Sequence, residues 1–190
     1  MLDYNLQIKG APILSLHSGS PIGTVVKPIM VPGLLQIAGL FVSSPLLNKK
    51  ESYILQSNAI RELSRHGIVI NSIDDVSPAD DLLRFKELIE INFDLLECRV
   101  KTKSGTRLGS VTNYILDGLL MVRQIVVKPS MLKSLSTTPL FIPRTAILEI
   151  KDRDIIVADT TKQIAMTKLP AKLDPDFVNP FAGKSKPREA

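Results

Sequence analysis

An internal repeat is the feature that most restricts what this 190-residue chain can fold into. Residues 18–25 (SGSPIGTV) align with residues 104–111 (SGTRLGSV), and four of the eight positions are identical. Residues 53–60 and 67–70 are similar in sequence to residues 140–147 and 154–157, which lie 87 positions further along the chain. The offset in the first block is 86. Chance similarity between short apolar segments would not keep a common offset, so two related units are predicted.

Each copy has the pattern of antiparallel β-structure. Alternating segments lead into glycine-containing turns, which supply the φ > 0 positions that hairpins need, and longer apolar runs are typical of buried strands. The strands predicted most clearly are 12–17, 34–42 and 68–70 in the first copy, and 96–102, 119–127 and 155–157 in the second. About six short strands in roughly seventy residues cannot bury two faces as an open sheet, so closure into a small barrel is expected.

A helix is predicted between the copies, from Pro78 to about Glu90. Ser77 is a suitable N-cap, Pro78 suits the first helical position, and Asp80 completes a capping-box-like S-x-x-D. Its apolar residues form a stripe that packs on a barrel or, alternatively, fills a groove of a partner: Leu82, Leu83, Phe85 and Ile89.

The predicted fold class is therefore all-β, with two small six-stranded barrels joined by a short α-helix. The first unit covers residues 1–74, the linker helix 75–91, the second unit 92–160, and residues 161–190 form a tail. Four prolines and few periodic apolar residues predict that this tail is extended and disordered.

The repeated pattern resembles the PRC-barrel family. The second copy matches it better, through Gly105, Gly109 and Val111, the Asp117-Gly118 turn, and the segments 141–143 and 155–157. The first copy departs from it, since Pro32-Gly33 replaces the acidic turn and Gln56 stands where a proline is expected. The resemblance implies compact barrels that act by binding, without a catalytic residue. In that family such barrels occur beside photosynthetic reaction centres and in a factor that matures the small ribosomal subunit, and neither of these two roles is carried over to this chain.

Composition narrows the function classes. A single cysteine, Cys98, excludes a disulfide framework and a multi-cysteine zinc site, and two histidines leave little for a metal centre. Cys98 alternates with Leu96 and Val100, which indicates a buried, inert thiol. No signal peptide and no span of about 20 apolar residues is evident, so a cytoplasmic protein is expected. We expect no catalytic residue, no cofactor and no metal, and therefore not an enzyme.

A basic strand is the main candidate site. Residues 1–90 carry a net charge of −1 and residues 91–190 carry +6. Arg99, Lys101 and Lys103 alternate and so point to one side of a strand, with Arg107 in the adjoining turn. These four cations contact an anionic partner such as RNA or lipid headgroups, or they protect an edge strand from aggregation. The matching positions of the first copy are taken as Ile13, Ser15 and His17.

Phe177 and Phe181 in the tail are the second candidate, as residues that dock on a partner or fold back over a barrel. Two functions remain open from the sequence: an adaptor in ribosome- or RNA-associated assembly, and a scaffold for a protein complex at the cytoplasmic membrane face or the division machinery. The expected partner is a protein or a ribonucleoprotein, without recognition of a DNA sequence. The oligomeric state is left open.

Overall fold

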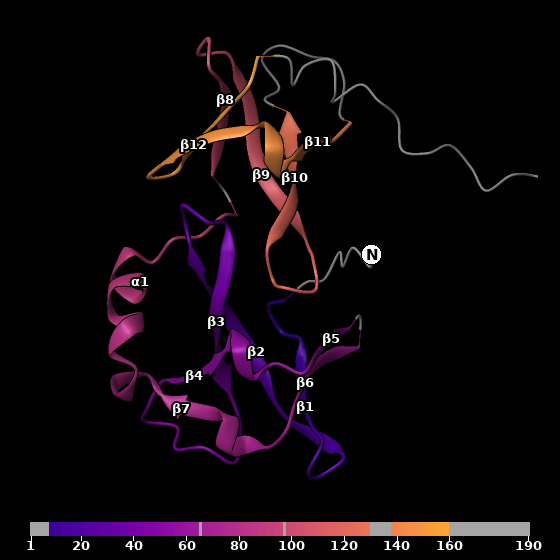
Figure 1. The fold of residues 1–190 in the computed structure, drawn as a ribbon, viewed down its shortest axis with the longest axis vertical. Helices are drawn as coiled ribbons and strands as arrows, with labels where there is room; N and C mark the ends of the chain where they lie inside the picture. The colour runs from indigo at the N-terminus through magenta and orange to yellow at the C-terminus, as the bar shows by residue number, and fades with distance from the viewer. Residues whose placement is uncertain (1–7, 65, 97, 130–137, 160–190) are drawn as a thin grey trace, which may run out of the picture.

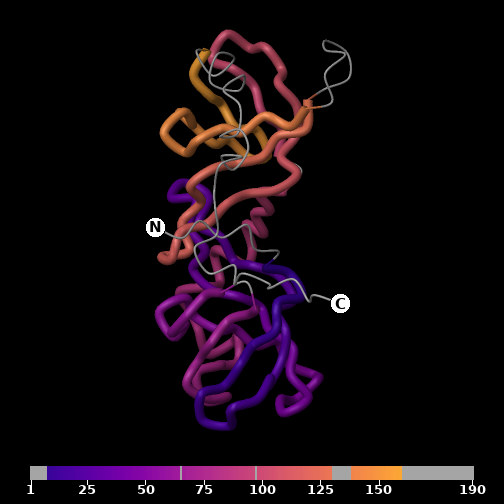
Figure 2. The backbone as a smooth tube through the Cα atoms, turned by 90° about the vertical axis from the view of Figure 1, so that its right-hand side faces the viewer, coloured from indigo at the N-terminus to yellow at the C-terminus, as the bar shows by residue number. Residues whose placement is uncertain are grey.

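The computed structural model describes residues 8–64, 66–96, 98–129 and 138–159. They form two curled β-sheets that follow one another along the long axis of the molecule, with a short helix beside the first sheet (Figure 1). The backbone trace in Figure 2 shows the same two lobes from the side. The prediction of an all-β fold with one short helix is confirmed.

The first sheet has seven strands, one more than predicted, in the order β5-β6-β1-β2-β3-β4-β7. Its strands are β1 (Pro12–Ser15), β2 (Ser20–Val31), β3 (Gln36–Ser43), β4 (Tyr53–Gln56), β5 (Glu62–Ser64), β6 (Gly67–Ile70) and β7 (Val76–Pro78). All ladders are antiparallel except that between β1 and β6, which is parallel.

The second sheet has six strands in the order β11-β10-β9-β8-β13-β12. Its strands are β8 (Arg99–Thr102), β9 (Arg107–Leu116), β10 (Val122–Pro129), β11 (Leu140–Pro143), β12 (Ile147–Lys151) and β13 (Asp154–Val157). The parallel ladder again joins the first and last strands, β8 and β13.

The two sheets share one strand order, apart from β7. The repeat-aligned segments occupy equivalent places, since residues 53–60 and 140–147 each form a strand followed by a 3₁₀ turn, and residues 67–70 and 154–157 form β6 and β13. Each sheet curls as a half-barrel, and among the described residues no ladder joins its two edge strands.

The second glycine of the repeated turn is required by close packing of backbones. A Cβ atom at Gly23 would lie 2.5 Å from the carbonyl oxygen of Ser43 on β3. A Cβ atom at the equivalent Gly109 would overlap the carbonyl oxygen of Lys128 on β10, and Gly109 has a φ of +154°. Only glycine lets the neighbouring strands come this close at both places.

The linker helix is present but begins later and is shorter than predicted. Residues 76–78 form β7, which pairs with β4, so Ser77 is not an N-cap. Single 3₁₀ turns follow at Ala79–Asp81 and Leu83–Phe85, and α1 covers only Lys86–Ile91. Strand pairing overrides the local capping signal here.

No capping box forms at Ser77, but one forms a few residues earlier, at the S-x-x-D sequence that begins with Ser72. The Ser72 hydroxyl accepts from a backbone N–H of the 3₁₀ turn Ile73–Asp75, and the Asp75 carboxylate accepts from the Ser72 N–H. Of the predicted apolar stripe, Phe85 is buried in a small cluster with Ile29 and Ile54, whereas Leu83 is exposed.

The two sheets meet through the turns of two equivalent hairpins. The turn between β2 and β3 contacts the turn between β9 and β10, and Gln36 forms an isolated antiparallel bridge with Met121. The Gln36 side-chain amide donates to the carbonyl oxygen of Leu119 over 3.3 Å. The Arg144 guanidinium donates to the carbonyl oxygen of Leu34.

The backbone hydrogen bonds at this junction are reciprocal. The N–H of Ile37 donates to the oxygen of Leu120 over 3.0 Å, and the N–H of Val122 donates to the oxygen of Leu35 over 2.9 Å. Ile37 and Val122 are equivalent residues of the repeat, 85 positions apart, and so are Leu35 and Leu120. Each hairpin therefore donates one backbone N–H to the other and accepts one in return, at equivalent positions. The arrangement has the form of a two-fold, self-complementary interface within one chain.

Leu35 and Leu120 are equivalent in a second respect, because both have positive φ, at 49° and 59°. Both side chains are buried in a hydrophobic core that runs through both sheets. Burial of the side chain offsets the strain of a left-handed leucine, which is rare outside such packed turns.

A candidate anion-binding face on the second sheet

Arg99 and Lys101 lie on the outer face of β8, as the alternation indicated, and Lys103 follows directly after the strand. The side chains of Val100 and Thr102 are buried, whereas Arg99 and Lys103 are exposed and Lys101 is half-buried. Arg107 is exposed at the start of β9 and pairs with Lys101 in the ladder. We call Arg99, Lys101, Lys103 and Arg107 the basic face.

The alternative explanation, protection of an edge strand, is wrong. β8 lies inside the sheet, hydrogen-bonded to β9 on one side and to β13 on the other. The edges of this sheet are β11 and β12. The basic residues therefore do not shield an unpaired backbone.

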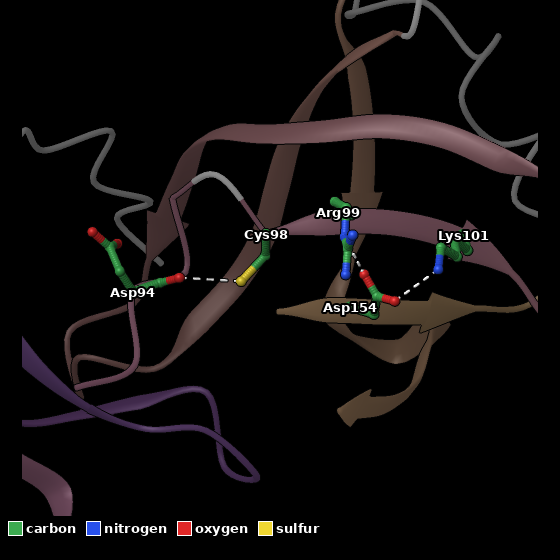
Figure 3. Close-up of polar contacts among 5 residues, drawn as sticks. All are labelled: Asp94, Cys98, Arg99, Lys101 and Asp154. Carbon is green, nitrogen blue, oxygen red and sulfur yellow. Dashed lines mark hydrogen bonds and ion pairs between the residues drawn. The ribbon is translucent and has the colours of Figure 1, made fainter. Parts of the chain in front are cut away.

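Asp154 neutralises part of the basic face (Figure 3). Its two carboxylate oxygens accept from Arg99 Nε at 2.6 Å and from Lys101 Nζ at 2.7 Å. The hydrogen bond from Lys101, followed by that from Arg99, lowers the pKa of Asp154 below its ordinary value. Parallel pairing of β13 with β8 sets Asp154 beside Arg99, which is why one carboxylate reaches both cations.

Arg99 and Lys101 are paired with Asp154, so Lys103 and Arg107 are the two cations of the basic face that are available to contact a ligand. Both side chains are exposed, and within the described part of the chain neither makes an ion pair. Asp159 lies near this end of β8, where its carboxylate accepts from the Ser104 backbone N–H over 3.0 Å. Hydrogen bonds from Ser104 lower the pKa of Asp159, and the charge of Lys103 lowers it further.

The matching positions in the first sheet differ from those predicted. The β1–β6 and β8–β13 ladders set Ile13 equivalent to Val100, so the counterparts of Arg99, Lys101 and Lys103 are Pro12, Leu14 and Leu16. The offset between the copies is thus 87 at β1, 86 in the turn that follows and 85 at the turn between β2 and β3, so the repeat slips at more than one place. The conclusion that only the second copy is basic holds, but its first-sheet counterpart is apolar.

Cys98 is buried, as predicted, whereas its neighbour Leu96 is exposed because β8 begins only at Arg99. The thiol donates a hydrogen bond to the backbone oxygen of Asp94 over 3.1 Å (Figure 3). Burial, with a smaller contribution from the Asp94 charge, raises the pKa of the thiol to about 11. A neutral thiol at this position has a packing role.

A polar cavity of about 240 Å³ between the sheets was not predicted from the sequence. Its lining includes Lys27 and Asn92, joined by a 2.8 Å hydrogen bond, together with Asp94, Tyr114 and Arg153. Burial raises the pKa of Tyr114 to about 12. These groups come from β2, the linker, β9 and the turn between β12 and β13, so no local sequence pattern marks them.

Phe177 and Phe181, and the tail from residue 161, lie outside the described residues. Within the described ranges, no three acidic, histidine or cysteine side chains gather as a metal site would require. In the same ranges no helix has the length and apolar character to cross a bilayer.

Besides the polar cavity, sequence reasoning missed two further features. One is Asp154, whose contact with the basic face joins residues 53 and 55 positions apart. The other is the hairpin junction, although its signal is visible: Gly33-Leu34-Leu35 and Gly118-Leu119-Leu120 repeat one another at an offset of 85.

No protein-family model matches the chain. No curated protein matches it either. Among solved structures, the chain is similar to RimM from Pseudomonas aeruginosa, a protein assigned to 16S ribosomal RNA processing, with 16% identity and a TM-score of 0.28. The match covers 72% of this chain and 94% of that chain.

Proposed function

We propose that this protein is a non-enzymatic adaptor of the PRC-barrel type that binds a ribonucleoprotein or RNA through the basic face of its second sheet, in the cytoplasm. The family assignment is supported by the sequence resemblance and by the common strand order of the two curled sheets. Neither the sequence resemblance nor the common strand order involves a catalytic residue.

The observation that carries the proposal is the position of the basic face on an interior strand. Cations on β8 cannot be explained as protection of an edge, because both neighbours of β8 are hydrogen-bonded to it. Arg99 and Lys101 are held in place by Asp154, and Lys103 and Arg107 extend from the same surface. A fixed pair of cations beside two exposed ones forms a surface that fits the spaced charges of a phosphate backbone.

The strength of the interaction follows from the charge balance. Asp154 pairs with Arg99 and Lys101, and the charge of Asp159 acts on Lys103, so two carboxylates offset part of the four positive charges and the face binds through a small number of phosphate contacts. Such an interaction weakens steeply as salt rises, because each phosphate contact releases a condensed counterion. The aromatic content is only 5% and there is no tryptophan, which favours contacts to phosphates over stacking on bases.

Gradient sedimentation of ribosomal particles from the native host tests this function. The full chain should sediment with particles at about 50 mM salt and leave them at about 300 mM. Lys103→Glu/Arg107→Glu should sharply reduce co-sedimentation at low salt. The matched control is Lys49→Glu/Lys50→Glu, which lowers the net charge by the same four units at an exposed turn of the first sheet and should sediment like the unaltered chain. Absence of the unaltered protein from the particles at low salt would refute the proposal.

A protein scaffold at the membrane face is the second candidate function, and the exposed leucines of the junction favour it. Leu34 and Leu119 occupy equivalent turn positions and are 52% and 72% exposed. Exposed apolar side chains at two equivalent turns suit a protein partner. This function predicts an association that tolerates salt and is lost in Leu34→Ser/Leu119→Ser, whereas the basic-face variant leaves it intact.

A further inference from the structure

The polar cavity between the sheets has a buried floor. Met30, Leu95 and Tyr114 line it, and their exposed fractions are 3%, 1% and 7%. The volume of the cavity is about 240 Å³. Since a water molecule in the liquid takes up about 30 Å³, the cavity has room for a ligand of roughly eight to ten non-hydrogen atoms. A largely apolar floor with a few polar groups is typical of a small-molecule site.

The rim of the cavity carries charges of both signs. Its exposed polar side chains are those of Lys27, Asn92, Asp94 and Arg153. Lys27 belongs to β2 of the first sheet, Asp94 to the linker, and Arg153 to the turn between β12 and β13. Two cations and one carboxylate therefore reach a single cavity from three separate segments of the chain.

The linker wall of the cavity is held by hydrogen bonds. Asn92 ends α1 with a φ of 44°, and its N–H donates to the oxygen of Leu88 over 3.1 Å. The Asp94 carboxylate accepts from the N–H of Leu96 over 2.9 Å. The backbone oxygen of Asp94 accepts from the Cys98 thiol, and Figure 3 shows the carboxylate directed away from that thiol. A wall that is ordered before a ligand arrives loses little entropy on binding.

The contacts of the charged groups indicate which of them meet a ligand. Lys27 Nζ is engaged, since it donates to Asn92 Oδ1 over 2.8 Å and lies 5.2 Å from the centre of the Phe41 ring. Arg153 is therefore the cation that we assign to a ligand anion.

Arg153, Asp94 and Tyr114 act within one region. Besides burial, which raises it most, the charges of Asp94 and Arg153 act on the pKa of Cys98 with opposite signs. Burial, followed by the charge of Asp94, raises the pKa of Tyr114 to about 12. The Tyr114 hydroxyl is thus protonated at neutral pH and can donate to a ligand oxygen.

We propose that this cavity binds a free α-amino acid with an apolar side chain. Arg153 and the Tyr114 hydroxyl hold the ligand carboxylate, and Asp94 holds the ligand ammonium. The ligand side chain lies on Met30 and Leu95. A ligand with only a negative charge would be repelled by Asp94, and one with only a positive charge by Arg153. Valine, leucine, isoleucine and methionine match the volume of the cavity.

Isothermal titration calorimetry of the full chain with these four amino acids tests the site, and at least one of them should bind. The matched probes are the same molecule without its amine and without its carboxyl group, which for leucine are 4-methylpentanoate and 3-methylbutylamine. Each probe should bind at least about tenfold more weakly, because each loses a charge-assisted contact. No heat of binding from any of the four amino acids at about 5 mM would overturn the proposal. A probe that binds as tightly as the amino acid would also overturn it.

Two variants test the assigned contacts. Asp94→Asn keeps an oxygen that accepts from the N–H of Leu96 but removes the charge, and Arg153→Gln removes the guanidinium. Each should weaken binding of the amino acid about tenfold or more. Asp94→Asn should also remove the preference for the amino acid over the carboxylate probe, which a purely structural effect would leave in place.

Lys49→Gln, at an exposed turn of the first sheet, is the matched control and should bind the amino acid like the unaltered chain. Unchanged binding in Asp94→Asn and Arg153→Gln would overturn the proposal. None of these variants alters the basic face, so this proposal and the proposed function fail independently.

Discussion

Gln36 and Met121 face each other across an isolated antiparallel bridge that joins the two sheets. The hydrogen bonds on either side of this bridge are reciprocal, and the leucines next to it, Leu35 and Leu120, are both buried with positive φ. Two copies of one hairpin thus meet as the subunits of a two-fold dimer meet. The core runs without interruption from one sheet into the other, so the sheets are expected to unfold together.

The junction prediction concerns the buried leucines. Leu35→Ala and Leu120→Ala should each lower the free energy of unfolding by about 2–5 kcal/mol, because each leaves a cavity where the sheets meet. The adjacent Leu34→Ala and Leu119→Ala remove exposed side chains and should change it by less than about 0.5 kcal/mol. Chemical denaturation measures these differences. Equal effects at buried and exposed leucines would show that the sheets do not pack through these turns.

The second prediction concerns the repeated glycine. Gly109→Ala should destabilise the protein by roughly 2–5 kcal/mol, since it combines overlap with the Lys128 carbonyl oxygen and strain at positive φ. Gly118→Ala is the matched control, because nothing lies within 4 Å of the added carbon. Thermal unfolding of the two variants checks the pair. A Gly109→Ala protein as stable as the Gly118→Ala protein would contradict the close approach of β9 and β10.

The third prediction concerns the pH dependence of the basic face. The pKa of Asp154 is lowered in the folded state, so its ion pairs contribute stability above the unfolded pKa and that contribution is lost as pH falls through the folded pKa. Lys101→Met should raise the pKa of Asp154 toward its ordinary value in a carboxyl-detected NMR titration. The pKa of Asp159, lowered mainly by Ser104, should not move. An Asp154 that titrates normally in the unaltered protein would show that the ion pairs do not form in solution.

The fourth prediction concerns Cys98. The thiol is buried and its pKa is raised to about 11, so at pH 8 almost none of it is thiolate. Thiol reagents should modify the native protein at least about a hundredfold more slowly than the urea-unfolded protein. Rapid modification in native buffer would contradict the burial of Cys98 beneath Asp94.

The sequence repeat predicted the fold well, because the two copies pair their strands in the same order. Similar residues occur in both copies at the glycine turns (Gly19 and Gly105) and in the segments around Tyr53 and Leu140. These segments form the same local structure in each sheet. The helix start at Ser77 was wrong because the same three residues also suit an edge strand, and pairing with β4 decides between the two.

The site was predicted in part. The alternation of Arg99, Lys101 and Lys103 fixed their common face, since that depends only on strand geometry. Their pairing with Asp154 depends on the parallel ladder of β8 and β13, which joins segments more than fifty residues apart. The register of the first-sheet counterparts failed for a similar reason, because the place of a one-residue slip is set by the ladder with β6.

Binding of the purified full chain to a fluorescent RNA hairpin, measured by anisotropy from about 50 to 300 mM salt, tests the central claim most directly. The account predicts binding at low salt that weakens linearly in log–log form, and a shallower slope for Lys103→Glu/Arg107→Glu. Each lost phosphate contact removes about 0.7 to 0.9 from the slope, so the variant should lose roughly 1.4 to 1.8. Lys49→Glu/Lys50→Glu should keep the original slope. Equal slopes and affinities for the two variants, or no binding by the unaltered chain at 50 mM salt, would contradict the assignment of the basic face.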